Sequence, residues 1–171
     1  LAAKQRRRGK ATEDSTDGLF AIDLTTGQHA WTYRGQSISH HTIAIGPENI
    51  YFIDSSITSE QRAAILLEDK TRLASLTSDE QKLAEKRALA KDVRQAVSLD
   101  IHSGQLNWRV AVDVTDCSDI GAGGGKLTLL YQSNILLICG ANANGHYWKQ
   151  FVAGEFTQRR LVALSAADGH K

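Results

Sequence analysis

The sequence predicts an all-β fold built from repeated units, and two observations lead to this prediction. Residues 20–31 (FAIDLTTGQHAW) and 97–108 (VSLDIHSGQLNW) are two copies of one motif, and residues 162–171 (VALSAADGHK) begin a third copy. Self-similarity of this kind is typical of an array in which each unit buries one face against the next. The segments beside the motif are short runs of β-branched and aromatic residues between turn formers, which favours strands.

The strands can be placed in chain order. A polar, basic linker (1–18) precedes residues 19–34, which supply the last two strands of a first unit. Residues 41–112 contain four strand-like runs, and residues 126–171 contain three more. The seven runs are 41–46, 49–54, 96–101, 105–112, 126–131, 134–140 and 160–165. Four short antiparallel strands per unit are typical of a propeller blade, so we predict a partial β-propeller of four-stranded antiparallel blades.

Two insertions enlarge the predicted units. Asp23 and Asp100 are 77 residues apart, whereas a four-stranded blade needs only about 40 to 45 residues. The extra residues fall between the second and third strands of each unit. The first insertion (57–95) carries helix-start signals and leucines at seven-residue spacing, which predicts an inserted α-helical hairpin. The second insertion follows residue 140 and is rich in aromatic residues.

The repeat itself resembles a known family. The pattern A-x-D-x-x-[TS]-G-x-x-x-W, present as AIDLTTGQHAW and nearly as SLDIHSGQLNW, resembles the repeat of β-propellers related to pyrroloquinoline-quinone enzymes. The resemblance covers about three quarters of the chain and implies a quinoprotein-like propeller of the bacterial cell envelope, in a periplasmic or other extracytoplasmic location. It also implies that the repeated glycines turn the third strand into the fourth and that the repeated tryptophans pack between neighbouring blades. The repeat positions are Asp23, Asp100, Gly27, Gly104, Gly169, Trp31 and Trp108.

Alternation of strand direction predicts which loops lie together. The connectors between blades (34–41 and 113–125) and both insertions should leave one face, while the short turns lie on the opposite face. Binding residues are usually found on elaborated loops of a rigid scaffold, so we expect a candidate binding face there. Its candidate residues are His40, His41, Asp116, His146, Tyr147 and Trp148.

Catalytic and cofactor motifs are weak in this sequence. The run GAGGGK (121–126) lacks the first glycine of a phosphate-binding loop, because Ile120 stands in its place, and a strand follows it where a helix is required. The acidic residues of the connector do not have the alternating spacing of calcium ligands. We therefore predict neither catalytic residues nor metal ligands nor a cofactor. Cys117 and Cys139 form a disulfide or serve as small apolar residues, and both alternatives stay open.

The composition points away from two classes of partner. The formal net charge is +1, from 20 basic and 19 acidic residues, which gives no general field for binding nucleic acid. Nothing in the composition suggests a membrane span. The pattern is cut at both ends, so we expect a fragment of a longer chain whose remaining blades are partners of these units.

The leading functional hypothesis is a non-catalytic scaffold or binding module. It would present its inserted loops on one face to a protein partner or a small ligand. The alternative is a fragment of a quinone-dependent dehydrogenase whose active-site blades lie outside this chain. Pyrroloquinoline quinone and calcium are expected only under that alternative. The adjacent cysteines of those enzymes do not occur in this sequence, and none of their catalytic residues can be placed on it.

Overall fold

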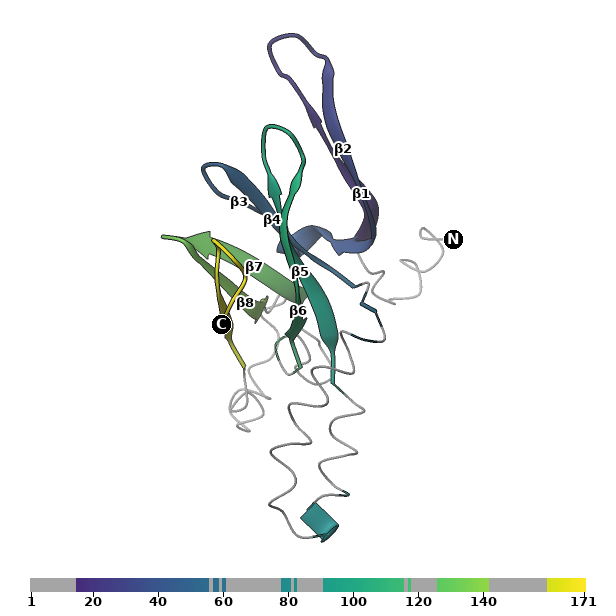
Figure 1. Cartoon of the computed structure of the whole chain (residues 1–171), viewed down its shortest axis with the longest axis vertical. Coiled ribbons are helices and arrows are strands. Elements are labelled where there is room, and N and C mark those ends of the chain that lie inside the picture. The colour runs from purple at the N-terminus through teal and green to yellow at the C-terminus, as the bar shows by residue number, and fades with distance from the viewer. Residues whose placement is uncertain are drawn as a thin grey trace, which may run out of the picture.

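The described part of the chain forms antiparallel β-structure with little helix (Figure 1). The computed structural model describes residues 15–55, 57–58, 60, 78–80, 82, 91–115, 117, 126–141 and 160–171. The all-β prediction is confirmed. The strands are β1 (Ser15–Ile22), β2 (His29–Ser39), β3 (Ala44–Ile45), β4 (Asn49–Asp54), β5 (Val93–Asp100), β6 (Leu106–Asp113), β7 (Lys126–Gln132), β8 (Ile135–Ala141) and β9 (Val162–Ser165), with a 3-10 helix η1 (His40–Thr42) before β3.

The strands fall into three groups that follow the chain. β1 and β2 form an N-terminal hairpin, which joins the next group through the single pair Ile38 and Asp54. β3, β4, β5 and β6 pair antiparallel in that order and form a central sheet. β7, β8 and β9 form a separate C-terminal sheet. Every pair is antiparallel, and within the described residues every pair except that of β2 with β4 joins strands that follow one another in the chain.

The central sheet is buried on both faces because its inner strands are apolar on both faces. On one face, Phe52, Val97 and Leu99 pack against Trp31 and Ile38 of the N-terminal hairpin. On the other face, the alternate residues of β4 and β5 pack against the C-terminal sheet. This second cluster includes Tyr51, Ile53, Ala96, Val112, Leu127, Leu129, Leu136, Ile138, Val162 and Leu164.

Strand direction separates two ends of the molecule. The tight turns after β1, β3, β5, β7 and β9 form one end, which we call the turn end, and the turns after β1, β3 and β5 point to the top of Figure 1. At the opposite end β4, β6 and β8 finish and β5, β7 and β9 begin. We call that end the rim, and it includes residues 39–42, 54–55, 91–93, 113–115 and 160–162. Both long excursions, 56–90 and 142–159, begin and end at the rim.

Several expected boundaries differ from the structure. β1 begins at Ser15, inside the expected linker, and β2 continues to Ser39 through the expected connector 34–41. The polar segment after Arg34 remains a strand because Asp54 holds its amides, as described below. Of the expected helical insertion 57–95, residues 60, 78–80 and 82 are helical, residues 57–58 and 91–92 are neither helix nor strand, and the last three residues already belong to β5. The remaining residues of the insertion lie outside the described residues.

The hairpin of β7 and β8 also has a different register. The predicted runs 126–131 and 134–140 would place Tyr131 opposite Asn134 and Cys139 opposite Lys126. Instead Tyr131 pairs with Leu136 and Cys139 with Thr128. The reason is a two-residue turn in which Ser133 (φ 48°) and Asn134 (φ 63°) both adopt positive φ, as tight hairpin turns require.

Candidate functional site

The three repeat turns share one backbone geometry. In each copy the glycine has a positive φ, which a side chain would strain, and its amide donates to the carbonyl of the residue four positions earlier. The values are φ 70° for Gly27, 69° for Gly104 and 75° for Gly169, with bonds of 2.8 Å to Asp23, 2.9 Å to Asp100 and 2.8 Å to Ser165. The structure thus places all three glycines in turns between strands or directly after a strand.

The aspartates of the first two copies stabilise these turns. Asp23 Oδ1 accepts hydrogen bonds from the amides of Thr25 and Thr26, each 2.8 Å long. Asp100 Oδ1 accepts 2.7 Å bonds from both the amide and the hydroxyl of Ser103. The Thr26 amide holds the pKa of Asp23 below its usual value, and the Ser103 hydroxyl does the same for the pKa of Asp100. Both residues therefore act on the backbone of their own turn.

Each tryptophan contacts the turn of the next copy. Trp31 Nε1 donates to the carbonyl of Ile101 at 2.9 Å, and a Cβ added to Gly104 would lie 2.6 Å from the Trp31 ring. Trp108 Nε1 donates to the carbonyl of Ala166 at 3.0 Å, and a Cβ added to Gly169 would lie 2.9 Å from the Trp108 ring. In both cases the indole ring lies where a larger residue would clash, so glycine is required for contact as well as for φ.

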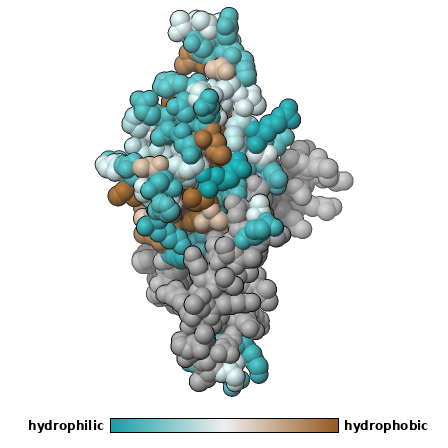
Figure 2. Space-filling model, in the orientation of Figure 1, coloured by the Kyte–Doolittle hydropathy of each residue, from teal (hydrophilic) through white to brown (hydrophobic). Residues whose placement is uncertain are grey.

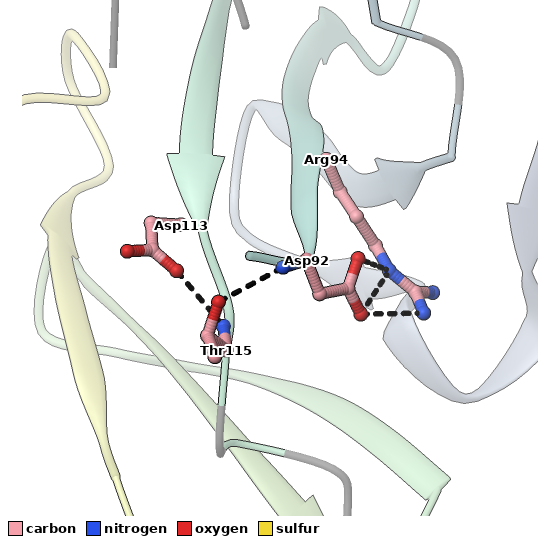
Figure 3. Close-up of polar contacts among 4 residues, drawn as sticks. All are labelled: Asp92, Arg94, Asp113 and Thr115. Carbon is pink, nitrogen blue, oxygen red and sulfur yellow. Dashed lines mark hydrogen bonds and ion pairs between the residues drawn. The ribbon is translucent and has the colours of Figure 1, made fainter. Parts of the chain in front are cut away.

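At the rim, one buried carboxylate links the flanks of both excursions. Asp113, whose side chain is 8% exposed, lies 3.2 Å from Lys91 Nζ and 3.1 Å from Arg160 Nη1. Its Oδ1 also accepts the amide of Thr115 at 3.0 Å, and Thr115 Oγ1 in turn accepts the amide of Asp92 at 2.9 Å (Figure 3). Lys91 directly follows the first excursion, and Arg160 directly follows the second.

The charge of Asp113 is strongly favoured in the folded protein. Burial alone would raise the pKa of this carboxyl group. Hydrogen bonds from Thr115, together with the cations Arg160 and Lys91, outweigh burial and lower the pKa to about 2. The group is therefore a carboxylate at neutral pH, and it joins the end of β6 to two segments that are remote in sequence. Asp92, which Figure 3 shows paired with Arg94 through contacts of 2.9–3.1 Å, is more exposed.

A second buried carboxylate lies where the first excursion begins. Asp54, at the end of β4, is 2% exposed. Its two oxygens accept the amides of Gln36 and Ser37 at 3.0 Å each, and an added Cβ at Gly35 would lie 2.6 Å from Asp54 Oδ2. Asp54 thereby holds the end of the N-terminal hairpin against the central sheet.

The structure locates two of the candidate binding residues. His40 and His41 are exposed at the rim, in the 3-10 turn η1. Asp116, His146, Tyr147 and Trp148 lie outside the described residues. Sequence reasoning missed Asp54, Lys91 and Arg160 as rim residues. A signal was present in that all three are charged, Lys91 and Arg160 directly follow an excursion, and Asp54 lies two residues before one.

The two cysteines are not joined by a disulfide. Cys117 is 3% exposed and belongs to the core cluster between the central and C-terminal sheets, whereas Cys139 is partly buried in β8. Cys117 thus takes the second of the two expected roles, that of a small apolar residue. Among the described residues, no group of three or more histidine, cysteine, aspartate or glutamate side chains is arranged to hold a metal ion.

Comparison with known proteins identified no relative of this chain. In the described part of the chain, no helix has the length and apolarity needed to cross a bilayer. Searches of family models, of curated proteins and of solved structures found no match to this chain.

Proposed function

We propose that the three groups of strands are successive blades of a β-propeller that binds a protein or a small ligand at its rim and has no catalytic activity of its own. Three features support the propeller. Within the six-stranded sheet that β1 and β2 join through a single pair, β3, β4, β5 and β6 are four antiparallel strands in chain order, as in a blade. Each group packs on the next through one face, and the same contact between tryptophan and turn recurs at both junctions.

The main support for a binding role is that Lys91 and Arg160 both form ion pairs with Asp113. These two cations border the two long excursions, so one carboxylate fixes the return point of both. The exposed His40 and His41 lie at the same end of the strands. A rigid scaffold with its long segments gathered at one end is the usual arrangement of a binding surface. The turn end, in contrast, has short turns, and those after β1 and β5 are held by their own aspartates, Asp23 and Asp100.

One experiment tests the binding role directly. A photocrosslinking amino acid is introduced into the full-length protein at His40 on the rim or at Glu48, which is 74% exposed in a turn at the other end. After irradiation in an extract of the cells that produce the protein, a discrete adduct is expected from position 40 and none from position 48. Equal labelling from both positions, or labelling from position 48 alone, would contradict a binding rim.

Two further measurements test the rest of the proposal. Electron microscopy of the full-length protein should show a closed ring of blades around an axis, and an open stack of sheets would refute the propeller. Addition of pyrroloquinoline quinone and Ca²⁺ should give no dye-linked oxidation of alcohols or sugars. Turnover under those conditions would overturn the non-catalytic assignment in favour of the dehydrogenase alternative.

A further inference from the structure

Two tyrosine rings stack across the junction between the central sheet and the C-terminal sheet. Tyr51 belongs to β4, and Tyr131 belongs to β7, 80 residues later in the chain. Their ring centroids are 5.4 Å apart, and the ring planes are 11° from parallel. Tyr51 is 2% exposed, and Tyr131 is partly buried against the same core cluster. Since the described residues of the two sheets share no strand pairing, this stack links two elements that pack on each other through side chains.

The two rings meet at the carbons through which tyrosines couple. A Cβ added to Gly46 would lie 3.1 Å from Tyr51 Cε2 and 3.4 Å from Tyr131 Cε1. Each of these atoms is a ring carbon next to the one that bears the hydroxyl group, and a tyrosyl radical has high spin density there. The glycine has no side chain to separate the rings, so the reactive carbon of each ring lies beside the same open position.

The surroundings direct one-electron oxidation to these rings. Methionine and cysteine are common targets of oxidants, but this chain has no methionine, and both of its cysteines are buried or partly buried. The ring of Trp108, which is partly buried, lies 6.1 Å from that of Tyr51. An oxidised tryptophan takes an electron from a nearby tyrosine, so oxidation at Trp108 also ends at Tyr51. Burial raises the pKa of Tyr51, so this phenol is neutral at neutral pH and loses its proton together with the electron.

We propose that Tyr51 and Tyr131 form an intramolecular dityrosine crosslink when the protein meets a one-electron oxidant, such as a haem peroxidase supplied with hydrogen peroxide. Each phenol loses one electron to the oxidant and one proton to water, which gives two tyrosyl radicals. The radicals pair in a new bond between Cε2 of Tyr51 and Cε1 of Tyr131. Both rings regain aromaticity as the hydrogen on each coupled carbon moves to the oxygen of its own ring. In total the pair loses two electrons and two protons, which convert one hydrogen peroxide into two water molecules.

This crosslink joins the two sheets at the end opposite the Asp113 network. Asp113 of β6 pairs with Arg160 at the rim, whereas Tyr51 and Tyr131 lie near the turn end, where β4 begins and β7 finishes. Unlike a disulfide, the new carbon–carbon bond is not reversed by a reductant. A covalent link between residues distant in sequence restricts the unfolded chain, so the modified protein is more stable. The inference does not depend on the proposed binding role.

The test uses the full-length protein and a small oxidant. Figure 2 shows a mostly hydrophilic surface over the described residues, with separate apolar patches, so the oxidant is water-soluble. It is a tris(bipyridine)ruthenium(II) complex photolysed with persulfate, which accepts the two electrons and becomes two sulfate ions. The protein is kept dilute, and denaturing gel electrophoresis separates monomers from crosslinked oligomers. Dityrosine fluorescence of the monomer and mass spectrometry of its peptides report the bond. N-acetyltyrosinamide oxidised in parallel shows that the oxidant is active.

Two variants with matched chemistry accompany the wild type. Tyr131→Phe removes one phenol and keeps a ring in the stack, so the fold is retained. The control is Tyr33→Phe, because Tyr33 also packs on an aromatic ring, that of Phe52 at 5.2 Å, but this neighbour has no hydroxyl group. Samples oxidised in urea show whether the bond requires the folded protein.

We expect one linked peptide pair, with residues 51 and 131, in the oxidised monomers of the wild type and of Tyr33→Phe. Its mass is lower by two hydrogen atoms than that of the separate peptides together, and the midpoint of thermal unfolding rises. Tyr131→Phe should lose both the linked pair and the rise in midpoint. Absence of the pair from the folded wild type, an equal yield in urea, or the same dityrosine yield in Tyr131→Phe would overturn the proposal. Links between separate molecules without the 51–131 pair would overturn it as well.

Discussion

Replacing Asp113 by asparagine should remove about 2 kcal/mol of folding free energy at neutral pH. The pKa of this carboxyl group falls from 3.8 to about 2 on folding, and a tenfold change in an acid dissociation constant corresponds to about 1.4 kcal/mol. Asparagine keeps the shape and an oxygen for the Thr115 amide but removes the charge that faces Lys91 and Arg160. The cost therefore measures the charge and not the packing.

The pH dependence of this loss has a definite sign. A carboxyl group whose pKa is lowered on folding stabilises the protein above its unfolded pKa, and the contribution disappears as the pH falls through the folded pKa. The stability difference between wild type and Asp113→Asn should therefore be about 2 kcal/mol at pH 7, shrink between about pH 4 and pH 2, and approach zero below pH 2.

Urea unfolding followed by circular dichroism at pH 7, 4 and 2 measures this difference. The matched control is Asp92→Asn, two residues before Arg94, because that aspartate is 40% exposed. An exposed ion pair contributes at most about 1 kcal/mol, so the control should change little at any pH. A loss for Asp113→Asn that is the same at pH 7 and pH 2 would refute the electrostatic argument. Equal losses in the two variants would refute the special role of Asp113.

Three further substitutions test the junctions between repeats. Gly104→Ala adds a methyl group 2.6 Å from the Trp31 ring at a positive φ. It should lower the free energy of unfolding by at least about 2 kcal/mol and alter the near-ultraviolet circular dichroism spectrum. An unchanged melting temperature would contradict this contact. Trp108→Phe removes the bond to the Ala166 carbonyl and should cost about 1 to 3 kcal/mol in urea unfolding, whereas a stability equal to wild type would count against the junction. Among the described residues the buried Ser98 Oγ has no hydrogen-bond partner, so Ser98→Ala should raise stability by up to about 1 kcal/mol in calorimetry, and a clear loss would show that the hydroxyl is used.

The strands and repeat turns were predictable because their signals are local. β4 matches the predicted run 49–54 in both bounds, and the positive-φ glycines follow from the aligned motif. The segment 34–39 could not be recognised as a strand, since it is polar and contains a glycine. Its strand conformation depends on the carboxylate of Asp54, which is remote in sequence.

The rim was only partly predictable. Alternation of strand direction indicated that both excursions leave the same end of the molecule. It also placed Asp113 at that end, among several acidic residues of the connector to which no role was assigned. Its partners Lys91 and Arg160 are 69 residues apart, and each follows a long insertion. Sequence spacing carries no information on which charges meet across such distances. The type of turn in β7–β8 was missed for a different reason, because serine seldom adopts the positive φ that Ser133 has.

The contact between each tryptophan and the following turn has a direction. The central group of strands receives the Trp31 ring on its Gly104 turn and places its own Trp108 ring on the Gly169 turn of the next group, so its two sides are complementary and not alike. Units with two different, complementary sides are joined head to tail, through heterologous contacts. Addition of a further unit of this kind would therefore lengthen the array without any new surface having to arise.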